Sequence, residues 1–264
     1  HQRKGWCDRY IRLNSYLTPK QLLVLIYYNM FRVSTDISNL AHDVCARCRF
    51  GVITMEIELK YRLNDASEAE AIFSDARIFA VTDPGSEKTI KMHAAYFDTE
   101  DASLSSKGMV FRVREEGDKL MATLKWDGVS IDGLHVREEI NVPLSDRGHF
   151  DNPNICVFSE SDIYEKLESA VLGKELVLMM EMSFVRRAVR LDTGTGIFEL
   201  SVDNGNISCR DKTKQINELE IELFSGSNDE LKELGEYISN KFKISPENHS
   251  KFRQGLDLVD KNRV

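Results

Sequence analysis

Cysteine is scarce and irregularly spaced in this sequence. The chain of 264 residues contains five cysteines, an odd number that argues against a framework of disulfides. Cys45 and Cys48 form a CxxC motif, but no second pair follows at the spacing of a zinc site. We interpret the cysteines as ordinary thiols of a reducing compartment, and we therefore expect a cytoplasmic protein.

Long hydrophobic runs are absent as well. The apolar stretch LLVLIYY at residues 22–28 falls well short of the roughly 20 residues that a membrane helix needs. The basic segment at the start is not followed by an apolar block with a small-residue cleavage site at signal-peptide spacing. These absences, with 42% hydrophobic and 30% charged residues, predict a globular protein without a membrane partner.

Acidic residues are scarce before residue 55 and outnumber basic residues after it. Residues 1–54 hold 8 Lys or Arg against 3 Asp or Glu, whereas residues 55–264 hold 27 against 40. The net charge therefore changes from +5 to −13 at Met55, which together give the overall −8. We interpret residues 1–54 as a basic extension that precedes a natural start at Met55, or alternatively as a small helical appendage around 19–32. The acidic part repels phosphate backbones, so we expect no nucleic-acid partner.

The common nucleotide-binding and nucleophile motifs are also missing. The sequence contains no Walker loop and no GxGxxG motif, and we recognise no Ser-His-Asp or Cys-His arrangement in it. A function must therefore come from residues of another kind.

What the sequence does contain is a regular series of strand patterns. Alternating stretches predict strands at 55–63, 91–99, 108–115, 119–126, 133–142, 175–191, 196–205 and 215–223. Helical spacing predicts helices at 66–80, 162–172 and 227–242. The short turn Glu116-Gly117-Asp118 joins two of the strands as a hairpin. Residues 55–264 are therefore expected to form one α+β domain.

At least five of these strands have one charged face and one apolar face. Alternation places Glu56, Glu58 and Lys60 on one face of the first strand, with Ile57 and Leu59 on the other. The same pattern groups Arg112 with Arg114, Thr123 with Lys125, Arg137 with Glu139, and Glu218 with Glu220 and Glu222.

A one-layer antiparallel sheet with a wet face would be the simplest explanation of such strands. Like charges that repeat about 7 Å apart repel one another, however, unless cations lie between them. We therefore expect a closed barrel whose charged faces point inward and whose apolar faces lie under the helices. Its interior would combine carboxylates suited to Mg²⁺ or Mn²⁺ with Arg and Lys suited to phosphates, as phosphoryl transfer requires.

The ordered motifs EIELK, YFDT, FRVR, TLK, GLHVREE, SFVRR, SVDNG, ELEIEL and SKFRQG resemble those of the CYTH superfamily, the triphosphate tunnel metalloenzymes. The resemblance covers residues 55 to about 256. It implies an eight-stranded antiparallel tunnel barrel with helices outside, and hydrolysis or cyclisation of a triphosphate substrate with divalent metal. The oligomeric state stays open between monomer and homodimer.

The resemblance also implies roles for individual residues. Metal ligands would be Glu56, Glu58, Glu220, Glu222 and Asp203, and Glu218 could join them. Substrate-binding residues would be Lys60, Arg112, Arg114, Lys125, Arg186 and Lys251, with Arg187 as the competing match for Arg186. Lys60, Arg137 and Glu139 would act in catalysis. For His135 and for Asp98 we favour structural roles, and Asp203 could instead cap a turn at Asn204-Gly205.

Within the superfamily, GLHVREE, SFVRR and INELEIELFSG look most like the bacterial inorganic triphosphatases. Those often carry a further His-rich helical domain, which this sequence does not include. A class IV adenylyl cyclase would usually show an aromatic residue before the first acidic strand, where Ile53-Thr54 stands here. A thiamine triphosphatase would need a stacking aromatic, for which Trp126 and Tyr96 are candidates. We favour hydrolysis of tripolyphosphate to pyrophosphate and phosphate over these and over a non-catalytic polyphosphate or nucleotide sensor.

Overall fold

The structure, a computed structural model, describes residues 52–260 of the chain, with side chains up to residue 258. The predicted extension at 1–54 and the CxxC motif of Cys45 and Cys48 therefore lie wholly or almost wholly outside the described residues. Within residues 52–260, no helix has both the length and the apolar character that crossing a membrane would require.

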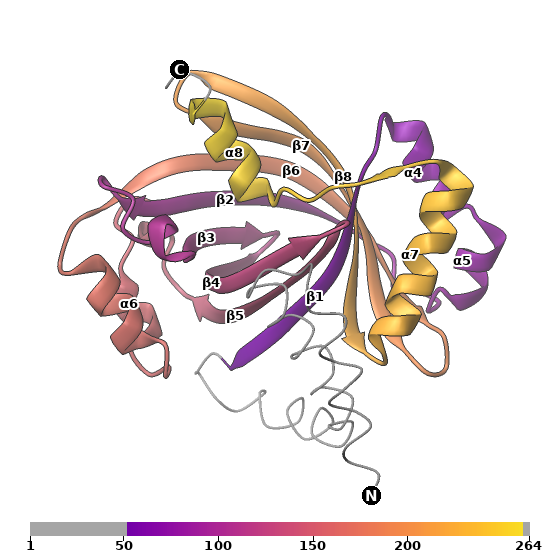
Figure 1. Cartoon of the computed structure of the whole chain (residues 1–264), viewed down its shortest axis with the longest axis horizontal. Coiled ribbons are helices and arrows are strands. Elements are labelled where there is room, and N and C mark those ends of the chain that lie inside the picture. Colours follow the sequence, from indigo (N-terminus) through magenta and orange to yellow (C-terminus); the bar gives the residue numbers. More distant parts are fainter. Residues whose placement is uncertain (1–51, 261–264) are drawn as a thin grey trace, which may run out of the picture. The chain divides into compact units, whose positions relative to one another are not determined.

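Eight long strands form a closed antiparallel barrel (Figure 1). Their bounds are β1 Ile53–Arg62, β2 Lys88–Thr99, β3 Val110–Glu116, β4 Lys119–Ile131, β5 Leu134–Leu144, β6 Leu176–Asp192, β7 Ile197–Cys209 and β8 Lys212–Ser225. The neighbours run in the order β5-β4-β3-β2-β6-β7-β8-β1, and pairing of β1 with β5 closes the ring. A two-residue strand, β9 (Ser245–Pro246), pairs with the end of β1. The predicted α+β barrel of eight strands is confirmed.

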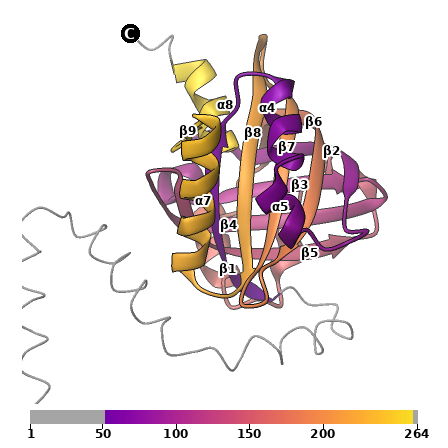
Figure 2. The same ribbon diagram turned by 90° about the vertical axis from the view of Figure 1, so that its right-hand side faces the viewer.

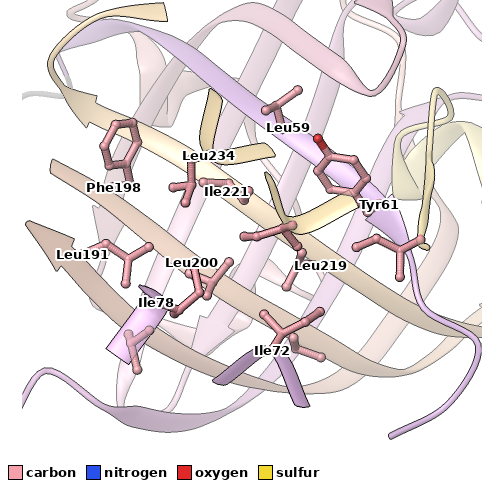
Figure 3. Packing of buried hydrophobic residues seen from close by; sticks show 14 of the residues in the cluster. Leu59, Tyr61, Ile72, Ile78, Leu191, Phe198, Leu200, Leu219, Ile221 and Leu234 are labelled. Atoms are coloured by element: carbon pink, nitrogen blue, oxygen red, sulfur yellow. The ribbon is translucent and has the colours of Figure 1, made fainter. Parts of the chain in front are cut away.

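One apolar core lies outside the barrel, between β1, β6, β7, β8 and three helices (Figure 2). These helices are α4 (Ala66–Phe73), α5 (Ala76–Val81) and α7 (Asn228–Phe242). Figure 3 shows Leu59 and Tyr61 of β1 and Ile221 of β8 meeting Leu234 of α7. The apolar members of the alternating strands thus face the helices, which leaves the charged members for the interior.

A second apolar core lies on the far side of the barrel from α7 (Figure 1). It is covered by α6 (Tyr164–Val171) and by short 3₁₀ segments, η2 (Ser105–Lys107) and η4 (Ile155–Phe158); a third, η3 (Arg147–His149), follows β5. Phe111, Leu124 and Ile140 of neighbouring strands contribute their outward side chains to it. Both outer faces that the sequence predicted as apolar are therefore buried.

The prediction of one continuous helix at 66–80 is wrong, because two shorter helices occupy this segment. The structure ends α4 at Phe73 and begins α5 at Ala76. The carboxylate of Asp75 accepts hydrogen bonds from the backbone N–H groups of Arg77 and Ile78, at 2.9 and 3.1 Å, and so caps a new helix. Helical spacing of apolar residues continues across the break, which is why periodicity alone did not show it.

The turn expected at Asn204-Gly205 is also wrong, because β7 continues through both residues to Cys209. A Cβ atom at Gly205 would lie only 2.2 Å from the carbonyl oxygen of Ser183 and 2.4 Å from Cα of Phe184 on β6. The glycine therefore permits a close approach of two strands rather than a reversal of the chain. Asp203 accordingly lies inside a strand and caps no turn.

A helix that the sequence analysis did not predict, α8 (Lys251–Asp260), packs against an apolar part of the barrel interior. Phe252 stacks on Tyr96 of β2 with ring centroids 5.5 Å apart. A Cβ at Gly255 would lie 2.2 Å from the sulfur of Met180, so any larger residue there would force the Met180 side chain to shift. The interior is therefore apolar beneath α8 and charged in its remaining part, rather than polar throughout.

Candidate active site

Strand register brings the charged inner faces together. On β1, Glu56 lies opposite Arg137 of β5, and Glu58 lies opposite Glu222 of β8. Lys60 lies opposite Glu220 on the same pair of strands. These pairs follow from antiparallel pairing with side chains that alternate strictly between the faces. Charges that are distant in sequence thus become neighbours inside the barrel.

A cavity of about 290 Å³ occupies the charged part of the interior. Every residue predicted for metal, substrate or catalysis lines it, whereas Glu218, which was left as a possible further metal ligand, does not. The predicted residues that line it are Glu56, Glu58, Lys60, Arg112, Arg114, Lys125, Arg137, Glu139, Arg186, Asp203, Glu220, Glu222 and Lys251. The structure thus assembles the predicted residues in one place, while their individual roles stay predictions.

Three carboxylates, Asp203, Glu218 and Glu220, surround the ammonium of Lys251, and we call them the Glu220 cluster. Nζ of Lys251 lies 2.8 Å from Asp203, 2.9 Å from Glu218 and 2.6 Å from Glu220. Further cations reach the same group. Arg186 binds Asp203 through two bonds of 2.7 Å and Glu220 through one of 2.6 Å, and Lys60 also pairs with Glu220.

These cations control the protonation of the Glu220 cluster. Burial by itself would raise the pKa of Glu220, but Lys251, Lys60 and Arg186 outweigh it and hold that pKa well below its usual value. Burial would also raise the pKa of Asp203, but the charges of Arg186 and Lys251 outweigh burial and lower that pKa. Asp203 and Glu220 are therefore ionised and already neutralised by side chains of the protein.

A second group of four carboxylates, Glu56, Glu58, Glu139 and Glu222, contacts among the described cationic side chains only Lys125, Arg137 and the Lys60 that it shares with Glu220, and we call it the Glu222 cluster. Lys125 Nζ lies 2.7 Å from Oε2 of Glu56 and 3.1 Å from Glu139. The guanidinium of Arg137 lies 3.0 Å from Glu56 and 3.2 Å from Glu58. Within residues 52–260, no cationic side chain lies within salt-bridge distance of the Glu222 carboxylate.

The pKa values in the Glu222 cluster reflect this shortage of positive charge. Burial, with repulsion from Glu56, Glu58 and Glu139, raises the pKa of Glu222 to about 8. Burial also raises the pKa of Glu58, although Lys60 acts against it. Glu56 alone is held well below its usual pKa, because Lys125 and Arg137 outweigh its burial. The cluster therefore holds more carboxylate than its side-chain cations can neutralise.

The donor chemistry of the Glu222 cluster fits a hard divalent cation, which prefers several carboxylate oxygens. The side chains do not yet form a ligand set, however, because no group of three Asp, Glu, His or Cys converges at metal-binding distance in the described part of the chain. Binding a metal would require Glu58 and Glu222 to turn toward a shared point. Residues of the Glu220 cluster are less available, since amino and guanidinium groups already occupy their oxygens.

Two arginines on β3 provide the positive side of the cavity. Arg112 donates to Thr123 at 3.3 Å and lies over the ring of Tyr96, while Arg114 pairs with Glu116. The Nε atoms of both arginines are buried without a hydrogen-bond partner. Burial and the neighbouring charge of Arg112 also lower the pKa of Arg114. Unpaired buried guanidinium donors and concentrated positive charge are both features that an oxyanion would relieve.

Several residues that line the cavity were missed or misjudged from the sequence. Glu116, predicted as part of the hairpin turn, lines the cavity and pairs with Arg114. Lys88 and Glu199, 2.6 Å apart, lie at the same site, and their inward strand parity was the available signal. The remaining missed lining residues are Ile90, Met92, Val110, Thr123, Asn141, Phe184, Phe224, Ser250 and Phe252.

The structure also decides between alternatives that the sequence left open. Arg186 lines the cavity, whereas Arg187 pairs with Glu70 and Glu87 outside it. Of the two candidate stacking aromatics, Tyr96 lines the cavity and Trp126 belongs to the outer core.

Asp98 and His135 have the structural surroundings that were favoured for them. The carboxylate of Asp98 accepts from the backbone of Thr99, Leu104 and Ser105 and so fixes a turn. His135 is 3% exposed and does not line the cavity.

Comparison with known proteins identifies the domain. The family model described as the CYTH domain matches residues 54–254. The chain belongs to the CYTH domain family. It is 28% identical over 166 residues to an inorganic triphosphatase of Haemophilus influenzae. That alignment covers 63% of this chain and 45% of the relative, so the chain spans about half the length of the curated protein that it matches.

Solved structures share the CYTH fold at low sequence identity. A putative adenylyl cyclase from Hippeastrum, described as having a dominant triphosphatase activity, has a TM-score of 0.60 at 20% identity, covering 76% of this chain and 95% of that one. A putative adenylate cyclase from Bacillus halodurans has a TM-score of 0.53 at 20% identity, covering 76% and 97%. These two likenesses establish the fold alone.

Proposed function

We propose that this CYTH protein is a divalent-metal-dependent triphosphatase that cleaves inorganic tripolyphosphate to pyrophosphate and phosphate. The observation that carries the proposal is the charge arrangement of the cavity: unpaired arginine donors face it from β3, and carboxylates in excess of cations face it from β1, β5 and β8. The similarity to the Haemophilus influenzae inorganic triphosphatase supports the choice of substrate.

The basic residues of the cavity have a direct use in this reaction. Arg112 and Arg114 would bind terminal phosphate oxygens through the guanidinium donors that now lack partners. Lys125 and Arg186 would neutralise further oxygens as negative charge redistributes in the transition state. Both are bound to carboxylates in the structure, at 3.1 Å to Glu139 and 2.7 Å to Asp203, so they are already oriented.

Glu56, Glu58 and Glu222 would hold the metal, and Glu220 with Asp203 would complete its surroundings. A divalent cation bound there supplies neutralisation of phosphate oxygens and activation of the attacking water. Lys60 lies 3.0 Å from Glu58 and also contacts Glu220, so it connects the two carboxylate clusters. Arg137 orients Glu56 and Glu58 through contacts of 3.0 and 3.2 Å. Glu139 is held by Lys125 and accepts from Asn141 at 2.8 Å.

The test is an assay of phosphate release by the full chain from tripolyphosphate, ATP and thiamine triphosphate, with Mg²⁺, with Mn²⁺ and with EDTA. We expect the highest turnover with tripolyphosphate and metal, and a loss of about 100-fold or more in Glu56→Gln and in Arg112→Ala. Glu138→Gln is the matched control, because Glu138 lies on β5 next to Arg137 and does not line the cavity.

Other outcomes would replace the proposal. Release of pyrophosphate from ATP, with a cyclic product, would identify a cyclase. Preferred hydrolysis of thiamine triphosphate would change the substrate. Binding of tripolyphosphate without turnover of any substrate would identify a sensor and contradict the enzymatic assignment.

A further inference from the structure

The segment 245–250 between α7 and α8, which we call the strap, is bonded along its length to one end of the barrel. The backbone N–H of Glu247 donates to the carbonyl oxygen of Lys60 at 2.9 Å. Asn248 accepts through its side chain from the N–H of Gly133 and through its carbonyl from Ser130, both at 2.8 Å. The buried carboxylate of Glu247 also pairs with Arg62. The strap is therefore anchored to β1 and to the hairpin of β4 and β5.

His135 lies between the strap and the active site. Its Nε2 is 2.8 Å from the carbonyl oxygen of Glu247, and its Nδ1 is 3.5 Å from Nη2 of Arg137, at the long end of hydrogen-bond distances. A carbonyl oxygen only accepts and a guanidinium only donates. Nε2 must therefore carry the proton, and Nδ1 must present its lone pair to Arg137. The two neighbours thus select one neutral tautomer.

Both ends of this contact lead to residues of the cavity. On one side, the guanidinium of Arg137 contacts Glu56 and Glu58 of the Glu222 cluster. On the other side, the strap leads directly into α8, whose first residue, Lys251, neutralises the Glu220 cluster. His135, buried at 3% exposure, is the side chain through which the strap contacts Arg137.

We propose that His135 is a positioning residue for the triphosphatase reaction, which orients Arg137 through Nδ1 and seats the strap through Nε2–H. The inference rests on the proposed function for its kinetic consequence, and on the hydrogen-bond chemistry for the tautomer. His135 contacts neither substrate nor metal in this scheme. It acts through Arg137 on the Glu222 cluster, and through the strap on Lys251.

Two substitutions separate the two bonds. In His135→Gln the amide nitrogen can still reach the Glu247 carbonyl, but no acceptor faces Arg137. In His135→Asn the shorter amide can still accept from Arg137, but it cannot reach the strap. We expect His135→Gln to lower kcat about tenfold at nearly unchanged KM, because an interaction made in catalysis is weakened. We expect His135→Asn to raise KM several-fold, because Lys251 is less firmly placed at the substrate site.

A double-mutant cycle tests whether His135 acts through Arg137. In an Arg137→Lys background, which keeps the charge, we expect His135→Gln to lower kcat by less than about twofold further. Ser130→Ala is the matched control, because Ser130 bonds the strap and lies 3.3 Å from Nε2 of His135 but does not contact Arg137, so that it leaves the Nδ1 contact in place. It should lower the melting temperature slightly and leave the kcat of the wild-type protein unchanged.

A measurement that needs no activity keeps this inference separate from the proposed function. The ¹⁵N chemical shifts of the His135 imidazole in the full chain should show the Nε2–H tautomer throughout neutral pH, and His135→Gln should supply the assignment. An Nδ1–H tautomer would overturn the inference even in an active enzyme. The inference would also be overturned if His135→Gln kept the wild-type kcat. The same holds if His135→Gln lowered kcat as much in the Arg137→Lys background as in the wild-type protein. An inactive wild-type protein with the Nε2–H tautomer would contradict only the proposed function.

Discussion

The Glu222 and Glu220 clusters are built from the same chemical group and yet differ in their charge balance. In the Glu220 cluster, Lys60, Arg186 and Lys251 lower the pKa of Glu220, and Arg186 and Lys251 lower that of Asp203. In the Glu222 cluster, burial and repulsion from Glu56, Glu58 and Glu139 raise the pKa of Glu222 to about 8, and no cationic side chain of the described residues pairs with it to offset them. A buried carboxylate is therefore not by itself a metal site. What distinguishes a candidate site is carboxylate that the protein leaves uncompensated.

Removing the main cation of the Glu220 cluster should have the largest effect on stability. Lys251→Met keeps most of the apolar stem and removes the ammonium that contacts Asp203, Glu218 and Glu220. Breaking a buried ion pair typically costs about 3–5 kcal/mol, because the remaining charge stays buried. Urea denaturation at pH 7.5 should show a loss of this size. Arg253→Met, on an exposed part of α8, is the control and should cost well under 1 kcal/mol.

Metal should stabilise the protein through the Glu222 cluster. We expect Mg²⁺ at about 100 times its dissociation constant to add about 2.7 kcal/mol to the free energy of unfolding, as for any ligand specific to the folded state. Thermal melts with Mg²⁺ and with EDTA measure this shift. It should nearly vanish in Glu58→Gln and persist in Glu138→Gln. If Mg²⁺ raised the melting temperature of Glu58→Gln and Glu138→Gln equally, the metal would bind outside the Glu222 cluster.

The high pKa of Glu222 predicts a pH dependence in the absence of metal. The unfolded chain releases this proton near pH 4.5, whereas the folded chain keeps it up to about pH 8. The folded state therefore binds more protons in this window, and the contribution of Glu222 to stability falls as the pH rises. Allowing for solvent screening in the cavity, Glu222→Gln should be more stable than wild type by on the order of 2 kcal/mol at pH 8. Melting curves in EDTA at pH 5 and 8 test this: equal differences at both values would contradict it.

The smallest effect is expected outside the barrel. Arg187 is adjacent in sequence to Arg186 but pairs with Glu70 and Glu87, whose side chains are 69% and 58% exposed. Exposed ion pairs contribute about 0–1 kcal/mol, so Arg187→Ala should change stability within that range and leave kcat unchanged. The matched variant Arg186→Ala should abolish most activity. Comparable losses of activity in the two variants would contradict the assignment of Arg186 to the site.

Much of the site was predictable because strand alternation is local. The pattern in MEIELKYRL indicates which side chains share a face, and the same holds for Arg112 with Arg114 and for Glu220 with Glu222. The ordered motifs then implied the closed barrel, and every predicted site residue lines its cavity. Errors occurred where contact overrides the local pattern: Asp75 interrupts a helical period, and Gly205 serves a close strand pair instead of a turn.

The sequence by itself determined the two faces of the strands, the concentration of carboxylate and guanidinium on one of them, and most of the charged residues of the site. Only the tertiary structure decided which carboxylates are neutralised and which are not, that α8 packs into the apolar part of the interior, and that His135 joins the strap to Arg137. The physical reason is the separation along the sequence of the residues that interact. Side-chain alternation repeats every two residues, whereas the pairing of Lys60 with Glu220 or of Lys251 with Asp203 depends on barrel closure and strand register, which bring together residues far apart in the chain.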